Sequence, residues 1–148
     1  IDVALFGAGR IGKIHAGNLA REAGARLKYV IDPNAAAAAA LAAQHGARTA
    51  ATAQVFADPA IGAVLICSYT DTHADLILAA AAAGKQIFCE KPVDLAIARA
   101  RTCAEAVSRA GVHCMIGFQR RFDPTFAAVK KRLAAGEIGI EMLRKVPI

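Results

Sequence analysis

The stretch that decides the fold reads Val3-Ala4-Leu5-Phe6-Gly7-Ala8-Gly9-Arg10-Ile11-Gly12. An apolar, strand-like run leads into the spacing G-x-G-x-x-G and then into a helical pattern. Gly7 permits a tight turn out of the strand, Gly9 lets the backbone approach a pyrophosphate, and Gly12 lets the helix lie close to the sheet. The amides of residues 10–13 and the positive end of the helix dipole then face phosphates. This order predicts a dinucleotide-binding turn with contacts from Gly7, Gly9, Arg10, Ile11 and Gly12.

A second apolar run, at residues 27–31, ends in Asp32, twenty positions after Gly12. A carboxylate at this point accepts hydrogen bonds from both hydroxyls of the adenosine ribose and repels a 2′-phosphate. The spacing therefore predicts that Asp32 binds the ribose and that the chain takes NAD rather than NADP. Asp32-Pro33-Asn34 also has the composition of a turn that caps the next helix, and the two roles are compatible.

The composition is that of a globular domain. With 148 residues, 56% of them apolar, the chain fits one domain and can bury a sizeable core. No uninterrupted apolar stretch reaches the roughly eighteen residues that span a bilayer, and no basic, apolar leader precedes the first strand. We therefore expect a soluble, cytoplasmic protein that has no membrane partner. The chain opens at Ile1 rather than Met, so a segment upstream of it is expected.

Cysteine spacing and charge argue against two other classes of site. The four cysteines, Cys67, Cys89, Cys103 and Cys114, form no C-x-x-C pair, which predicts buried thiols and no metal site. The net charge of +6 is spread mainly over predicted helices without interleaved aromatic residues, which favours solvated helical faces over nucleic-acid binding. Part of the positive charge would attract an anionic dinucleotide.

Strand-like runs recur along the chain, and each is followed by a helical pattern. The runs lie at residues 2–6, 26–31, 63–67, 86–89 and 113–117. This alternation predicts an α/β fold, a doubly wound parallel Rossmann sheet with helices on both faces. The expected later helices start at Asn34, Thr52, Thr72 with Asp75 as a capping-box acid, Asp94, and Pro124. We assign residues 1–139 to the nucleotide-binding domain, and residues 140–148 to the start of a second domain that the chain does not contain.

Polar residues follow three of the predicted strands at the point where each ends. They are Ser68-Tyr69-Thr70-Asp71-Thr72-His73, Glu90-Lys91-Pro92 and Phe118-Gln119-Arg120-Arg121-Phe122-Asp123. In open parallel sheets the ligand lies beyond the carboxyl ends of the strands. We therefore expect hydroxyls, a histidine, a lysine and two arginines to converge on one edge of the sheet.

Taken together, the glycine turn, Asp32 and these three segments resemble the Gfo/Idh/MocA oxidoreductase family over residues 1 to about 139, and the Glu-Lys-Pro triplet is the sharpest mark. Members pair a Rossmann domain with a second α/β domain that covers the substrate and often mediates oligomerisation, so the resemblance implies a homo-oligomer at full length. It also implies hydride transfer from a secondary alcohol of a polyol or sugar to NAD, with C2 of myo-inositol as the specific hypothesis.

Lys91 is the predicted catalytic residue. Oxidation of an alcohol requires the hydroxyl proton to leave as hydride departs, and a lysine that hydrogen-bonds this oxygen can move the proton. A lysine beside a cationic nicotinamide and away from water would have a lowered pKa, which suits this task. The alternative is a surface lysine that merely follows a strand. The resemblance further implies a cis peptide at Lys91-Pro92 and contacts of Lys91 with both cofactor and substrate.

The resemblance supplies the remaining site residues. Glu90 is assigned to the cofactor shell, with an ordinary strand-end carboxylate as the alternative. Ser68, Tyr69 and Thr70 are expected along the cofactor with His73 beside them, although a histidine at a helix start is also a common structural hydrogen-bond partner. Gln119 and Arg120 are expected to contact the substrate, and Arg121 is expected to lie at the surface.

The sequence departs from the family in one respect that matters for activity. Members supply an aspartate and a histidine from the second domain to complete proton transfer with the lysine, and nothing after Ile148 provides them. We expect these 148 residues to bind NAD but to oxidise polyols poorly or not at all alone. Two other functions stay open, a non-catalytic NAD-sensing module and an S-adenosylmethionine methyltransferase. The G-x-G-x-x-G turn and the Glu-Lys-Pro triplet favour the dehydrogenase.

Overall fold

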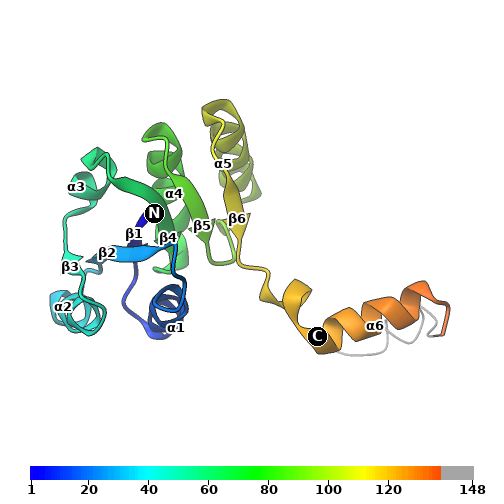
Figure 1. Cartoon of the computed structure of the whole chain (residues 1–148). Coiled ribbons are helices and arrows are strands. Elements are labelled where there is room, and N and C mark those ends of the chain that lie inside the picture. The colour runs from blue at the N-terminus through cyan, green and yellow to red at the C-terminus, as the bar shows by residue number, and fades with distance from the viewer. Residues whose placement is uncertain (138–148) are drawn as a thin grey trace. The chain divides into compact units, whose positions relative to one another are not determined.

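The computed structural model describes residues 1–137. Its centre is a six-stranded parallel sheet in the order β3-β2-β1-β4-β5-β6 (Figure 1). The strands are β1 Asp2–Phe6, β2 Arg26–Ile31, β3 Arg48–Thr49, β4 Ile61–Ile66, β5 Gln86–Cys89 and β6 Cys114–Ile116. The helices are α1 Arg10–Leu19, α2 Ala35–Gln44, α3 Thr52–Ala57, α4 His73–Ala82, α5 Ile97–Ala110 and α6 Pro124–Ala134, with short 3₁₀ turns η1 Thr70–Thr72 and η2 Gln119–Phe122. The predicted doubly wound sheet is confirmed.

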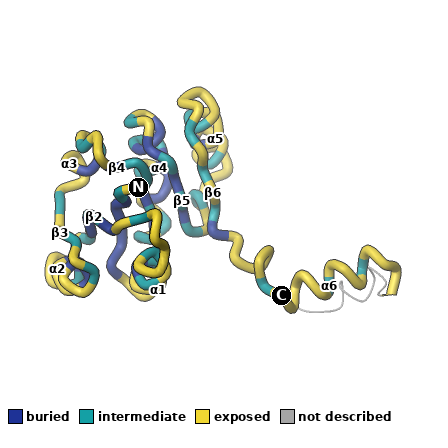
Figure 2. The backbone as a smooth tube through the Cα atoms, in the orientation of Figure 1, coloured by how far each residue is buried: buried dark blue, intermediate teal, exposed yellow. Residues whose placement is uncertain are grey.

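Helices cover both faces of the sheet because successive strand residues point to opposite sides. In β1, Leu5 packs into a core with α1 and α2, whereas Ala4 and Phe6 pack into a second core with α3, α4 and α5. The central strand β1 is buried between the helices over most of its length, whereas the edge strand β3 and the outer surfaces of the helices are exposed (Figure 2). Each fully buried large apolar side chain contributes about 1.5–3 kcal/mol to folding. Burial on both faces explains why the inner strands β1 and β4 are almost continuously apolar rather than alternating.

Several predicted helix boundaries are confirmed by their caps. The Asn34 side chain accepts a hydrogen bond from the Ala37 amide at 3.0 Å, so it caps α2. Asp123 caps α6, with Pro124 as the first helical residue.

Two predicted caps are wrong, because their side chains bind elsewhere. Thr72 does not form a capping box with Asp75, since its hydroxyl donates to the Tyr69 carbonyl at 2.7 Å and Asp75 pairs with Arg99. Asp94 does not cap α5, which begins only at Ile97. The Asp94 carboxylate instead accepts from the Ala96 amide at 2.8 Å and pairs with Arg99.

Residues 1–117 form one compact unit, and a second unit begins at Phe118. The assignment of residues 118–139 to the nucleotide-binding domain stays a prediction. The strand expected at residues 140–146 lies outside the described residues. Within residues 1–137, no helix is both long and apolar enough to cross a membrane.

The four thiols are free. Cys89 and Cys103 are buried and Cys67 and Cys114 half-buried, so the prediction of buried thiols holds in full for the first two. Burial raises the pKa of both Cys67 and Cys89 to about 12, which leaves these thiols protonated and unreactive.

Charged side chains tie the strands together at the amino edge of the sheet, opposite the glycine turn. The Lys28 ammonium lies 2.7 Å from the Asp58 carboxylate, and the buried Lys85 ammonium donates to the Asp58 carbonyl at 2.8 Å. Hydrogen bonds from Lys28 and from the Ala60 amide lower the pKa of Asp58 to about 2. Asp58 therefore links β2 to the segment that enters β4.

Replacing Asp58 by asparagine tests this link. The pKa of Asp58 is lower in the folded protein than the ordinary 3.8, so its contribution to stability is present above about pH 4 and is lost as the pH falls toward about 2. We expect Asp58→Asn to lower the free energy of unfolding at neutral pH, and the difference from wild type to shrink below about pH 4. Urea unfolding across this pH range measures it.

Asp71→Asn is the matched control, because Asp71 is exposed and makes no ion pair within residues 1–137. A difference between Asp58→Asn and wild type that stayed constant down to pH 2 would contradict the assignment.

Candidate dinucleotide-binding site

The glycine turn connects the carboxyl end of β1 to α1. At β1 the strand order reverses, because β2 and β3 lie on one side of it and β4, β5 and β6 on the other. Gly7 has φ +101°, and a Cβ atom there would overlap the backbone carbonyl of Cys67, just past the end of β4. A Cβ atom on Gly12 would overlap the Gly7 carbonyl itself. The first turn of α1 therefore rests directly on the β1 turn. These contacts account physically for two of the three glycines.

Gly9 is different, because a Cβ atom there would meet nothing within 4 Å. Gly9 is exposed and sits at the N-cap position of α1, where it provides no side-chain cap. The first turn of α1 also lacks an acidic residue, so its positive end is uncompensated. An open backbone surface at an uncapped helix start is what a pyrophosphate needs, and these residues fit a dinucleotide. Arg10 is exposed and Ile11 half-buried in the same turn.

Asp32 is tied to the glycine turn through its carboxylate. One oxygen accepts from the Ala8 amide at 2.7 Å, and the other accepts from the Asn34 amide at 2.8 Å. A carboxylate has about four acceptor positions, so two remain for ribose hydroxyls. Asp32 thus stabilises the turn that precedes α2, which is one of its two predicted roles. Its role toward ribose stays a prediction.

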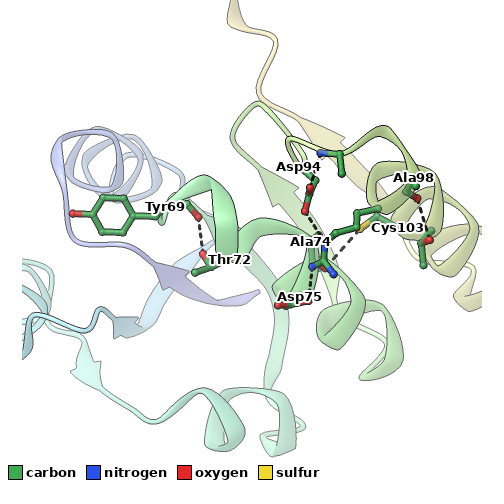
Figure 3. A network of polar contacts seen from close by, with 10 residues as sticks. Tyr69, Thr72, Ala74, Asp75, Asp94, Ala98 and Cys103 are labelled. Atoms are coloured by element: carbon green, nitrogen blue, oxygen red, sulfur yellow. Dashed lines mark hydrogen bonds and ion pairs between the residues drawn. The ribbon is translucent and has the colours of Figure 1, made fainter.

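The segment after β4 is held by its own hydroxyls. Ser68 and Thr72 share a hydrogen bond of 2.6 Å between their side-chain oxygens, and this segment turns through η1 into α4. Tyr69 is 79% exposed, and its ring points away from the Thr72 hydroxyl that binds the Tyr69 carbonyl (Figure 3). Ser68, Tyr69 and Thr70 therefore lie beyond the carboxyl end of β4, where the topology places a ligand.

Glu90 lies at the end of β5 and forms a contact that the sequence analysis missed. Its carboxylate is 2.9 Å from Nε2 of His15 on α1, and its amide donates to the Ile66 carbonyl at 2.9 Å. The His15 ring also packs against Phe88, with 4.9 Å between the ring centroids. Both partners of the pair are about one-fifth exposed. This pair joins the helix of the glycine turn to the strand that leads into Lys91.

Lys91 is exposed, and the peptide that links it to Pro92 is cis, as the resemblance implied. Downstream, Asp94 and Asp75 both pair with Arg99, at 2.8 Å and 2.6 Å, and this network fastens the segment after Lys91 to the starts of α4 and α5 (Figure 3). The Ala96 amide and Arg99 hold the pKa of Asp94 below its usual value. The backbone around Lys91 is therefore anchored, while the residue itself is exposed.

His73 is buried, with 2% of its surface exposed. Both ring nitrogens lie against backbone carbonyls, Nδ1 at 2.8 Å from Pro92 and Nε2 at 3.0 Å from Ser68. The structure thus gives His73 a hydrogen-bonding role between two loops, the alternative weighed in the sequence analysis. A direct contact with the cofactor stays a prediction.

Gln119 and Arg120 lie in η2 of the second unit, and both are exposed. The Arg120 guanidinium stacks over the Phe126 ring of α6 at 4.7 Å from its centroid. Neither residue belongs to the first unit, and their contacts with substrate stay predictions.

Alanine substitutions in the glycine turn separate folding from binding. Gly9→Ala should leave the free energy of unfolding close to wild type, because the new methyl group meets no protein atom. It should raise the Kd for NAD by roughly tenfold or more, since the methyl group occupies the phosphate approach. Gly7→Ala should lower the free energy of unfolding by about 1–3 kcal/mol or more through backbone strain and overlap.

Thermal unfolding and calorimetric NAD titration measure the two effects. Gly24→Ala is the control, because its Cβ also enters open space but lies far from the turn in the fold. Unchanged NAD affinity in Gly9→Ala would argue against pyrophosphate at this turn.

Comparison with known proteins agrees with this geometry. Residues 1–118 match the family model described as "Oxidoreductase family, NAD-binding Rossmann fold" (GFO_IDH_MocA). The chain is 50% identical over 144 residues to an inositol 2-dehydrogenase of Rhizobium meliloti, covering 97% of this chain and 44% of the relative. It is 44% identical over 142 residues to a scyllo-inositol 2-dehydrogenase (NAD(+)) of Bacillus subtilis, covering 94% and 42%.

A solved structure is similar over the same region. The scyllo-inositol dehydrogenase of Lactobacillus casei with bound NAD(H) and scyllo-inositol has a TM-score of 0.85 and 29% identity, covering 94% of this chain and 42% of that chain. The chain thus spans less than half the length of the relatives it matches. The glycine turn, the six-stranded topology and the match over residues 1–118 place this chain in the Gfo/Idh/MocA oxidoreductase family, as its NAD-binding Rossmann domain.

Proposed function

We propose that this chain is the NAD-binding domain of a dehydrogenase that oxidises a secondary alcohol of a polyol or sugar, with C2 of myo-inositol as the specific substrate position. The observation that carries the proposal is the exposed Lys91 amine at the same carboxyl edge as the uncapped glycine turn. Support comes from the inositol dehydrogenase names of the relatives and from the NAD(H) and scyllo-inositol in the Lactobacillus casei structure.

In this proposal, one group of residues binds the cofactor and Lys91 transfers the proton. The amides of the glycine turn hold the pyrophosphate and Asp32 holds the adenosine ribose. Ser68, Tyr69, Thr70 and Glu90 lie along the cofactor between its pyrophosphate and its nicotinamide, where the hydride is transferred. When bound, NAD supplies the acceptor for the hydride that leaves the alcohol carbon. Lys91 hydrogen-bonds the alcohol oxygen and takes its proton as the ketone forms, a contribution that is commonly worth about 10²–10⁴ in rate. Gln119 and Arg120 are proposed to bind further hydroxyls of the substrate.

The surroundings of Asp32 favour NAD over NADP. A cavity of about 570 Å³ lies beside it, lined by alanines of α2, by residues 49–51 and by Gln54. None of the described side chains that line this cavity is cationic. A 2′-phosphate would therefore meet the Asp32 carboxylate without a compensating positive charge.

Titration of the chain with both dinucleotides tests this preference. We expect NADP to bind at least roughly tenfold more weakly than NAD, because of carboxylate–phosphate repulsion. Asp32→Ser should weaken NAD binding and reduce the difference between the two dinucleotides. Asp58→Asn is the control, because it removes a carboxylate at the opposite edge of the sheet. Tighter binding of NADP by wild type would overturn the role of Asp32.

Lys91→Ala tests the proton-transfer role. In the full-length protein we expect kcat for inositol oxidation to fall about 10²–10⁴-fold, because the proton acceptor is lost. The Kd for NAD should change less than about twofold, since the glycine turn and Asp32 remain. Steady-state NADH formation and calorimetry measure the two quantities.

Lys91→Arg is the matched variant, since arginine is a long basic side chain that stays protonated and so cannot accept the alcohol proton. It should be as inactive as alanine. Near-wild-type turnover in either variant would refute the role of Lys91. An NAD-binding protein without any polyol-dependent NADH formation would instead support the non-catalytic NAD-sensing module.

A further inference from the structure

We propose that His73 is a positioning residue for Lys91, and that its buried ring fixes the Lys91–Pro92 turn against the loop after β4. The proposal rests on the proposed role of Lys91 and adds to it. The ring contacts the two segments that flank the reacting end of the site. The ring contacts backbone carbonyls of both segments, so the side chains of Lys91 and Ser68 take no part in these contacts.

The geometry gives the ring two separate anchors. Nδ1 lies 2.8 Å from the Pro92 carbonyl, and Nε2 lies 3.0 Å from the Ser68 carbonyl. Carbonyl oxygens only accept, and a neutral imidazole carries a single N–H, so a neutral ring donates to one of the two carbonyls and only an imidazolium donates to both. His73 begins α4 directly after η1, and only 2% of its surface is exposed. A buried polar ring that lost these acceptors would leave its own polar atoms unsatisfied, so the contacts are costly to break.

Lys91 lies between two fixed backbone points. On one side the Glu90 amide donates to the Ile66 carbonyl, and the Glu90 carboxylate is paired with His15. On the other side, the Pro92 carbonyl lies 2.8 Å from Nδ1 of His73. Among the described residues, no hydrogen bond or ion pair involves the Lys91 amine itself. The surrounding contacts therefore set the direction of the chain at Lys91 and leave the amine available for a substrate oxygen.

Two features separate this role from a direct cofactor contact. The ring is buried and both of its nitrogens already face protein carbonyls, so a ligand would have to displace one of them. The Pro92 contact also joins His73 to the residue next to Lys91. A displacement of about 1 Å in a catalytic group can lower the rate about 100-fold. Loss of the Pro92 anchor should therefore lower turnover more than it lowers cofactor affinity.

Three substitutions separate the two anchors. His73→Asn places an amide nitrogen near the position of Nδ1, so it can still donate to Pro92. His73→Gln places one near Nε2, so it can still donate to Ser68. His73→Phe keeps the ring volume and removes both ring nitrogens. In the full-length protein we expect kcat to fall roughly 10–100-fold in His73→Phe and His73→Gln, and most of it to be recovered in His73→Asn. The Kd for NAD should stay within about twofold in His73→Asn and His73→Gln.

A second readout does not depend on turnover. In the 148-residue chain, the NMR amide signal of Lys91 should stay sharp and single in wild type and His73→Asn. It should broaden or split in His73→Phe and His73→Gln, because the turn loses its anchor. Thermal unfolding of each variant shows which of them are folded. The Asn and Gln variants keep one polar contact each, so they give the comparison even where His73→Phe does not fold.

The outcomes are distinct. Equal losses of kcat in His73→Asn and His73→Gln, unchanged kcat in folded His73→Phe, or loss of folding in all three variants would overturn the positioning role. A wild-type protein that binds NAD but forms no NADH with any polyol refutes the proposed function instead. In that case the Lys91 amide signal alone decides whether His73 fixes the turn.

Discussion

Backbone atoms of three segments meet at the turn between β1 and α1 with no room between them for a side chain. Gly7 lies against the backbone of Cys67 beyond β4, and Gly12 lies against the carbonyl of Gly7. This contact sets how closely α1 approaches the sheet and aims the uncapped start of the helix beyond the carboxyl edge. Larger residues at either position would move the helix, and the binding surface would move with it.

The rest of the site is arranged around this turn by contacts between distant parts of the chain. Asp32 accepts from the Ala8 amide and so ties the end of β2 to the turn. His15 reaches from α1 to Glu90 at the end of β5. His73 connects the loops after β4 and β5. Polar contacts with good geometry in partly buried places hold each strand end in a defined position, which is the support that a catalytic lysine needs.

Local patterns allowed most of the fold to be predicted. The apolar runs and the glycine spacing depend on neighbours in sequence, and these indicated the parallel sheet, the turn and the helix starts at Asn34 and Pro124. The two-residue strand β3 was missed because it is too short for a period. The caps at Thr72 and Asp94 were wrong because Tyr69, Ala96 and Arg99 compete for their side chains. The His15–Glu90 pair spans 75 positions, and nothing local indicates it, although His15 follows Gly12 by three residues and so shares its helix face.

A crystal structure of this chain with NAD tests most directly whether the glycine turn binds the pyrophosphate. We expect the pyrophosphate oxygens to accept hydrogen bonds from the amides that follow Gly9, and the adenosine ribose hydroxyls to donate to Asp32. Gly7 and Gly12 should keep the backbone contacts that they make without the cofactor. A dinucleotide bound elsewhere on the sheet, or a pyrophosphate held by side chains away from the glycine turn, would contradict this binding role.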